Sequence, residues 1–299
     1  MNKLKCWAAV LIAALLLPNV AASADAAKDA YEKGKARLDK KDYDGAITAF
    51  TEAIRLDPKF ALAYCNRGDA YGDKLDFNRA ITDFNKAIRL DPKLAMAYCG
   101  RGIAYRDNGE YGKAIVDLTE AIRLDPKYAL AYNNRGVAYN TKNEYDKAIA
   151  DFTEAIRLNP TYALANNNRG VVYVKSGDMT KALSDFSEAI QLDANYPDAY
   201  NNRGFIFSRK GKYDKAIADF TEAIRLDPKH SSSFCLRGIA YYENREYDKA
   251  IADCTEAIRL NPKYANAYYN RGNAYVKKGD KAKAADDFTE AKELGSKDR

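Results

Sequence analysis

A glycine recurs at intervals of 34 residues along almost the whole chain, and this period constrains the fold more than any other feature. The eight glycines are Gly34, Gly68, Gly102, Gly136, Gly170, Gly204, Gly238 and Gly272. When each is numbered as position 8 of a repeat, position 20 is alanine in every repeat, from Ala46 to Ala284, and so is position 27, from Ala53 to Ala291. A fixed period of about 20–50 residues is the signature of stacked structural units.

Each repeat has the pattern of two helices joined by a turn. In Tyr128–Lys142 apolar residues recur at helical spacing around Gly136, where a second helix can approach closely. A second amphipathic segment runs from Tyr145 to Leu158, and Pro160 ends it. We expect left-handed backbone at the turn between the helices, because four repeats carry glycine there. These turn glycines are Gly109, Gly177, Gly211 and Gly279.

A 34-residue helix-turn-helix with small residues at positions 8, 20 and 27 resembles the tetratricopeptide repeat. The resemblance implies an all-α fold, a right-handed superhelical α-solenoid of eight helix-turn-helix repeats. Neither helix of a repeat can bury its apolar side alone, so we expect the repeats to stack into a single solenoid over residues 25–299. The predicted repeats lie near residues 27–60, 61–94, 95–128, 129–162, 163–196, 197–230, 231–264 and 265–298.

The first 24 residues have the pattern of a secretory signal peptide. Two lysines precede an apolar run from Trp7 to Leu17, and Ala22-Ser23-Ala24 supplies the small residues of a cleavage site. We therefore expect residues 1–24 to be removed and the protein to be exported, to the periplasm or outside the cell. The alternative is an uncleaved N-terminal anchor. No other segment of the sequence is long and apolar enough to span a membrane.

Composition and motifs argue against an enzyme and against nucleic-acid binding. The net charge is +6, but the charges are interspersed and no block of lysine and arginine forms a footprint for nucleic acid. His230 is the only histidine, and we expect it to be a packing residue because it has no catalytic or metal-binding partners in the sequence. The sequence contains no nucleotide-binding, nucleophile or paired-histidine metal motif, so we expect no cofactor and no metal.

Arginine and aspartate recur sixteen residues apart in repeats two to eight. Bidentate arginine suits partly buried ion pairs, so we expect structural contacts between the two helices of each repeat. The first repeat lacks both residues and has Lys33 and Ala49 instead. The expected pairs are Arg67–Asp83, Arg101–Asp117, Arg135–Asp151, Arg169–Asp185, Arg203–Asp219, Arg237–Asp253 and Arg271–Asp287.

Four cysteines follow the signal-like segment: Cys65, Cys99, Cys235 and Cys254. Three of them share position 5 of their repeats. Equivalent positions on stacked helices lie about 8–10 Å apart, farther than the α-carbons of a disulfide. We expect free, partly buried thiols.

Function is expected on the concave surface, which in the tetratricopeptide repeat family is lined by positions 2, 5, 6, 9, 12 and 13 of each repeat; we call these the groove positions. Asparagine recurs at positions 5 and 6, in a pattern that resembles the asparagine ladder of the repeat domain of O-GlcNAc transferase. Such amides can pair with the backbone of an extended peptide. The alternative, left open, is that asparagine is simply common at this position. The candidate peptide-binding residues are Asn66, Asn133, Asn134, Asn167, Asn168, Asn201, Asn202 and Asn270, with the apolar Val137, Val171 and Phe205.

Charge changes along the predicted groove. Position 13 is Asp39, Asp73 and Asp107 in the first three repeats, and Lys175 and Arg209 in repeats five and six. We therefore expect a protein-interaction adaptor whose groove binds an extended segment of a protein or peptide. The alternatives are a self-assembling scaffold of the cell envelope, which would be a homo-oligomer, and a non-catalytic specificity subunit of a separate enzyme.

Overall fold

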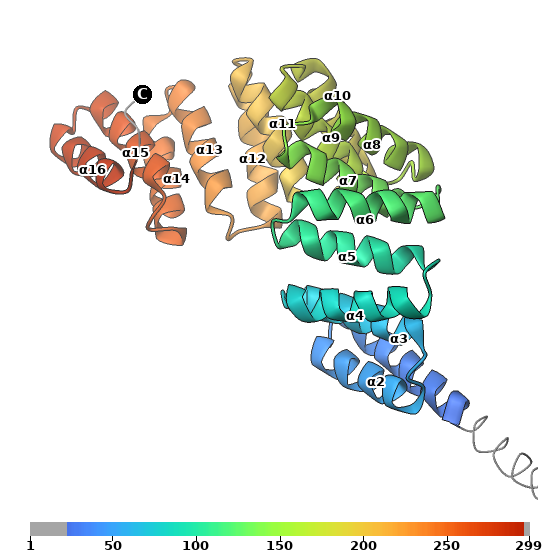
Figure 1. Cartoon of the computed structure of the whole chain (residues 1–299). Coiled ribbons are helices and arrows are strands. Elements are labelled where there is room, and N and C mark those ends of the chain that lie inside the picture. The colour runs from blue at the N-terminus through green and yellow to red at the C-terminus, as the bar shows by residue number, and fades with distance from the viewer. Residues whose placement is uncertain (1–22, 296–299) are drawn as a thin grey trace, which may run out of the picture. The chain divides into compact units, whose positions relative to one another are not determined.

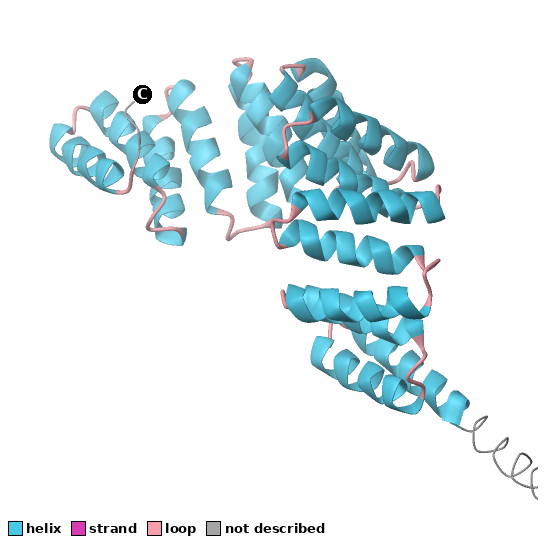
Figure 2. Cartoon of the chain, in the orientation of Figure 1, coloured by secondary structure: helices cyan, strands magenta, loops and turns pink. Residues whose placement is uncertain are grey.

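The computed structural model describes residues 23–295, and all the regular structure among them is helical (Figure 2). The predicted signal peptide lies outside the described residues except for Ser23 and Ala24, which begin a helical stretch over residues 23–38. Within the described range, no helix combines the length and the apolar character needed to cross a membrane.

The chain divides into two compact units, Met1–Leu158 and Asn159–Arg299. After the helical residues 23–38, the first unit contains α2 (Tyr43–Leu56), α3 (Ala61–Asp73), α4 (Phe77–Leu90), α5 (Ala95–Asp107), α6 (Tyr111–Leu124), α7 (Ala129–Thr141) and α8 (Tyr145–Leu158). The second unit contains α9 (Ala163–Ser176), α10 (Met179–Leu192), α11 (Pro197–Arg209), α12 (Tyr213–Leu226), α13 (Ser231–Glu243), α14 (Tyr247–Leu260), α15 (Ala265–Lys278) and α16 (Lys281–Glu293). The predicted all-α fold of helix-turn-helix repeats is confirmed. A single solenoid domain over residues 25–299 stays a prediction.

Within each unit the helices pack in chain order, as Figure 1 shows for the stack from α2 to α6. In the first unit the odd-numbered helices, the first of each repeat, also contact one another: α3 with α5, and α5 with α7. In the second unit the same holds for α9 with α11, α11 with α13, and α13 with α15. The second helices of neighbouring repeats make no such contacts among the described residues. The first helices therefore lie closer together, on the concave side of each unit.

The recurring glycine is explained by close packing inside each repeat. A Cβ atom at Gly170 would lie 2.6 Å from Cε1 of Phe186, and Phe186 is fully buried. In the seventh repeat a Cβ at Gly238 would lie 2.9 Å from Sγ of Cys254, which replaces the phenylalanine. Protein cores have no room for such an extra atom without displacing a neighbour. The two helices of a repeat can approach this closely only because position 8 has no side chain.

The turn between the two helices adopts left-handed backbone in every repeat. The predicted turn glycines have φ of 80°, 89°, 69° and 84°. The other four repeats adopt the same conformation with residues that favour it less. These residues are Lys41, Leu75, Asn143 and Arg245, with φ between 59° and 63°. The glycine pattern therefore predicted the turn correctly, and the geometry extends to repeats in which the sequence signal is missing.

All seven predicted arginine–aspartate pairs are formed. In each, Nε and Nη2 of the arginine donate to the two carboxylate oxygens at 2.6–2.9 Å, and the pair is partly buried. This is the bidentate geometry that makes arginine suitable for such sites. Each pair joins the first helix of a repeat to the second, so these arginines are structural.

The four predicted free thiols are free, and they are buried rather than partly buried. Burial raises the pKa of Cys99 to about 12 and that of Cys235 to about 11. Protonated thiols react slowly, so these cysteines serve the structure as small core residues.

Candidate functional site

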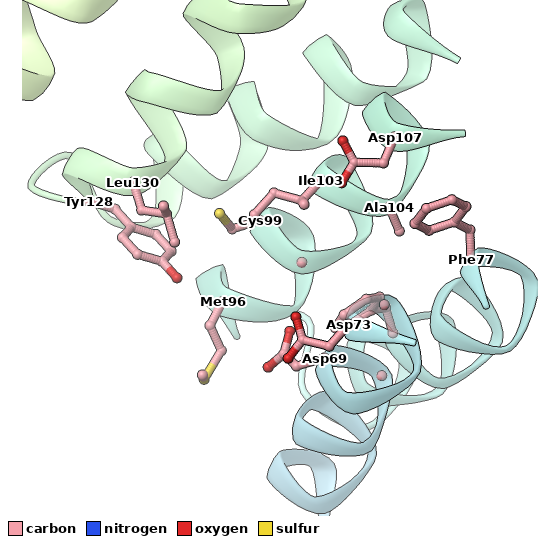
Figure 3. A pocket seen from close by; sticks show the side chains of 14 residues that line it. Asp69, Asp73, Phe77, Met96, Cys99, Ile103, Ala104, Asp107, Tyr128 and Leu130 are labelled. Carbon is pink, nitrogen blue, oxygen red and sulfur yellow. The ribbon is translucent and has the colours of Figure 1, made fainter. Parts of the chain in front are cut away.

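Each unit has a pocket on its first helices, and both pockets are lined mainly by the predicted groove positions. In the first unit the pocket lies between α3, α5 and the start of α7 and has a volume of about 360 Å³. We call it the acidic pocket, because three aspartates line it: Asp69, Asp73 and Asp107. Figure 3 shows Asp69 and Asp73 next to each other on α3, opposite the side chains of α5.

Asp69 is the most unusual residue of the acidic pocket. The residue lines the cavity and is partly exposed. Burial raises the pKa of Asp69 to about 7, and the neighbouring Asp73 adds to the effect. Burial also raises the pKa of Asp73, opposed by the charge of Lys41. A cation that binds beside such a carboxyl group stabilises its ionised form.

Apolar and uncharged residues form the rest of the acidic pocket. Met96, Ile103 and Leu130 contribute aliphatic walls, and Leu130 is 38% exposed. Gly100 takes the place of the asparagine found at position 6 in five of the other repeats. A Cβ at Gly100 would lie 3.2 Å from Oδ1 of Asp69, so the backbone of α5 passes close to this carboxyl group.

The second unit has a pocket of about 310 Å³ between α11 and the start of α13, with Asn167 of α9 at its edge. We call it the amide pocket. Asn202 Nδ2 donates to Oδ1 of Asn167 at 2.9 Å. Asn201 Nδ2 lies 3.2 Å from Nδ1 of His230, while the buried Oδ1 of Asn201 has no hydrogen-bond partner among the described residues. Phe205, which is 36% exposed, forms an apolar wall.

His230 is held by its neighbours in the fold. Besides its contact with Asn201, its Nδ1 lies 2.6 Å from Oγ of Ser233, near the start of α13, the helix that His230 precedes. His230 also lines the amide pocket, and its packing role stays a prediction. In the described part of the chain, no group of three or more histidine, cysteine, aspartate or glutamate residues could hold a metal ion.

The predicted asparagine ladder lies deeper in the structure than expected. Five of its members are buried: Asn66, Asn133, Asn134, Asn167 and Asn201. Asn168, Asn202 and Asn270 are partly exposed. The ladder cannot be followed from end to end, because Asn134 lies in the first unit while Asn168 and Asn202 lie in the second.

Several ladder amides link one repeat to the one before it. Asn66 Nδ2 donates to the hydroxyl of Tyr31 at 3.0 Å, and Asn202 pairs with Asn167 as described above. Asn270 Nδ2 reaches Sγ of Cys235 at 3.7 Å. In each case position 6 of one repeat meets position 5 of the preceding repeat. These contacts favour the structural interpretation of the asparagines, and peptide binding by them stays a prediction.

Asn134→Ala is expected to lower the free energy of unfolding by about 1–3 kcal/mol, because it removes a buried side chain together with two hydrogen bonds, one of them to a charged group. Asn134 Nδ2 donates to the carbonyl of Leu130 at 2.8 Å, and its Oδ1 accepts from Arg106. Urea denaturation measures the change. The control is Asn78→Ala on exposed α4 surface, which should stay within about 0.5 kcal/mol of wild type. Equal stability of both variants would show that the Asn134 side chain does not stabilise the fold and is available to bind a peptide.

The structure places the apolar candidates unequally. Phe205 lines the amide pocket, whereas Val137 and Val171 are partly buried and line neither pocket. Sequence reasoning missed Asp69, Met96 and Leu130. The signal for Asp69 was present, because it is acidic at position 9, which is apolar in the five repeats that follow.

Comparison with protein families agrees with the repeat pattern. Profiles described as tetratricopeptide repeat match residues 61–94, 129–162, 197–230, 235–299 and 84–116, and profiles described as TPR repeat match 34–74, 102–143 and 172–211. Together these matches cover most of the chain from residue 34 onward. The chain belongs to the tetratricopeptide repeat family. A search of curated protein sequences found no significant match to this chain.

Solved structures show the same tetratricopeptide repeat fold. The APC/C hetero-tetramer Cut9–Hcn1 matches with a TM-score of 0.69 and 20% identity, covering 86% of this chain and 50% of the other, so the present chain spans half the length of that relative. A tetratricopeptide repeat protein from Parabacteroides merdae matches with a TM-score of 0.59 and 23% identity, over 79% of this chain and 93% of the other. YrrB, described as having an unusual peptide-binding site, matches with a TM-score of 0.51 and 26% identity, over 65% of this chain and 97% of YrrB.

Proposed function

We propose that this protein is an interaction adaptor that binds an extended segment of a partner protein along the groove positions of its first helices. The observation that carries the proposal is that both the acidic pocket and the amide pocket open on these positions. Pockets that combine apolar walls with a few polar groups are typical of binding sites. The similarity to YrrB supports the class of ligand, since that protein has a peptide-binding site.

The two pockets present exposed apolar side chains that a partner can cover. Leu130 is 38% exposed and Phe205 is 36% exposed, and each lies at the mouth of its pocket. Exposed apolar surface bordered by polar groups is a mark of protein-interaction sites and ligand-binding grooves. Val116, which is 68% exposed on α6, offers a comparable apolar side chain on a second helix.

Leu130→Lys and Phe205→Glu should each reduce recovery of the partner at least about tenfold, because a buried charge without a counter-charge at the contact costs more than about 1.4 kcal/mol. The measurement is quantitative mass spectrometry of proteins retained by the immobilised chain from extracts of the cells that produce it. Val116→Glu is the matched control and should retain wild-type recovery. Equal recovery by the wild type and all three variants would contradict the proposal that the groove is the binding surface.

We also propose that residues 1–24 direct export, on the strength of the signal-peptide pattern alone. Cleavage before Asp25 would remove Trp7, the only tryptophan of the chain. It would also remove the hydrogen bond from Ser23 Oγ to the carbonyl of Leu56, at 3.0 Å. Intact mass and fluorescence of the protein purified from its own cells test this together. Tryptophan emission from that protein would count against export by cleavage.

A further inference from the structure

We propose that the acidic pocket binds a lysine or arginine side chain of the partner segment. This inference rests on the proposed function and adds to it the chemistry of one anchor residue. Its basis is an unpaired carboxyl group on the wall of a cavity whose other walls are largely apolar.

Asp69 is a departure from the pattern of its position. Position 9 is apolar in the five repeats that follow: Ile103, Val137, Val171, Phe205 and Ile239. A carboxylate at such a place costs free energy unless it is paired. Asp69 forms no hydrogen bond or ion pair with any residue between 23 and 295, although the arginine–aspartate pairs of the same fold are all satisfied. The fold therefore leaves this carboxyl group available to a ligand.

The cations near the acidic pocket do not neutralise Asp69. Arg106 donates through Nε to Oδ1 of Asp107 at 2.7 Å, and its Nη1 donates to Asn134. Lys41 is near enough to lower the pKa of Asp73, but no ion pair joins the two in the described chain. Asp107 is thus already paired with Arg106. Asp69 and Asp73 are the two aspartates of the pocket whose carboxyl groups have no ion-pair partner in the described chain.

The walls of the pocket suit the stem of a basic side chain. Met96, Ile103 and Leu130 present aliphatic surface, and Figure 3 shows these residues around the cavity into which Asp69 and Asp73 face. Lysine and arginine bury their methylene groups against such surface while their charged ends find a polar partner. The volume of about 360 Å³ is near the lower end of ligand pockets, which span about 300–1,000 Å³, so it suits one long side chain.

Binding of a cation should depend on pH in a defined direction. The pKa of Asp69 is raised to about 7 by burial, so the free pocket is largely protonated below pH 7. A bound cation favours the carboxylate and lowers this pKa, so affinity rises with pH through about 7 and falls in acid. The groups that influence Asp69, or are influenced by it, are Asp73, Cys65, Cys99 and Tyr128, with Arg106 and Asp107 beyond them. Burial keeps Cys65, Cys99 and Tyr128 protonated across this range.

The test uses the full-length protein and two blocked, fluorescent peptides of alanine and leucine that differ at one central residue. One peptide carries arginine and the other citrulline, which has nearly the same shape but no charge. Fluorescence anisotropy at pH 8 should show the arginine peptide binding at least about tenfold more tightly, a difference equal to one pKa unit of coupling. At pH 5.5 the advantage of arginine should shrink by a similar factor.

Asp69→Asn should abolish the preference for arginine and its pH dependence while the protein stays folded, because the amide keeps the shape of the side chain. Asp146→Asn is the matched control. It removes the same charge from an exposed site in the first turn of α8, away from the groove positions, and should behave as wild type. Circular dichroism of each variant verifies the fold.

Equal binding of the two peptides, or a preference for arginine that survives Asp69→Asn, would overturn the proposal, and so would failure of both peptides to bind. The proposed function is decided separately by crosslinking to the partner in cells, which does not depend on the charge of this pocket. If the groove crosslinks to a partner but binds the two peptides equally, the adaptor function would stand and only the proposed binding of a basic side chain would be wrong.

Discussion

Asp151→Ala should lower the free energy of unfolding by about 3 kcal/mol, the low end of what is lost when one partner of a buried ion pair is removed. Arg135 donates to both carboxylate oxygens of Asp151 at 2.8 Å, and the side chains are 17% and 8% exposed. Without the aspartate, Arg135 keeps one hydrogen-bond partner among the described residues, Thr119, through Nη1 at 3.0 Å. It also keeps its contacts with the rings of Tyr132 and Tyr139. A partly buried guanidinium would then face α8 without its counter-charge.

A double-mutant cycle separates the pair from its surroundings. Arg135→Ala should also destabilise the protein, and the double variant should cost less than the sum of the two by well over about 0.5 kcal/mol. Arg157 and Glu154 on the same helix α8 provide the control. They too form a bidentate pair, at 2.8 and 2.6 Å, but are 66% and 32% exposed, so their coupling should be about 0.3–0.5 kcal/mol. Equal couplings for the two cycles would contradict the structural role assigned to the seven repeated pairs.

Phe186→Ala is expected to cost about 3–5 kcal/mol, the range for removing a buried aromatic ring. Phe186 is fully buried, lies against Gly170 within its own repeat, and packs in one cluster with Ile206 of the next repeat. Its loss would therefore weaken both the helix pair and the contact between neighbouring repeats. In a solenoid, such contacts between neighbours supply much of the stability.

The control for Phe186 is another phenylalanine of the same unit. Phe205 is 36% exposed at the mouth of the amide pocket, so Phe205→Ala should change stability by less than about 1 kcal/mol while weakening the capture of a partner. Thermal unfolding followed by circular dichroism measures both variants. If Phe205→Ala destabilised the protein as much as Phe186→Ala, Phe205 would be a core residue and would leave the proposed binding surface.

The fold could be predicted almost completely because its determinants repeat. Gly170 lies against Phe186, and the glycine at position 8 makes the equivalent contact in the other repeats. Because the pattern occurs eight times, the close approach of the two helices could be predicted from the sequence. The arginine–aspartate spacing was equally informative, since a separation of sixteen residues fits only a contact between the two helices of a repeat. Left-handed backbone at Leu75 was not predicted, because an exposed leucine gives no sign of a turn imposed by its neighbours.

The candidate site was predicted only in part, for the same reason. Periodic analysis identifies what repeats share, whereas the positions expected on the concave side came from the resemblance to the tetratricopeptide repeat family. The acidic pocket depends on two departures from the pattern, Asp69 and Gly100, which a search for shared residues passes over. The burial of Asn134 was also missed, because a single sequence cannot show how closely the first helices of neighbouring repeats approach.

Site-specific photocrosslinking in the cells that produce the protein tests the central claim most directly. A photoreactive phenylalanine analogue replaces Leu130, Phe205 or, as a control, Val116, one position at a time in the full-length chain. We expect covalent adducts with another protein from Leu130 and from Phe205, and none from Val116. Adducts from Val116 alone, no adducts at any position, or adducts only with a second copy of this chain would contradict the adaptor, and the last result would establish self-assembly instead.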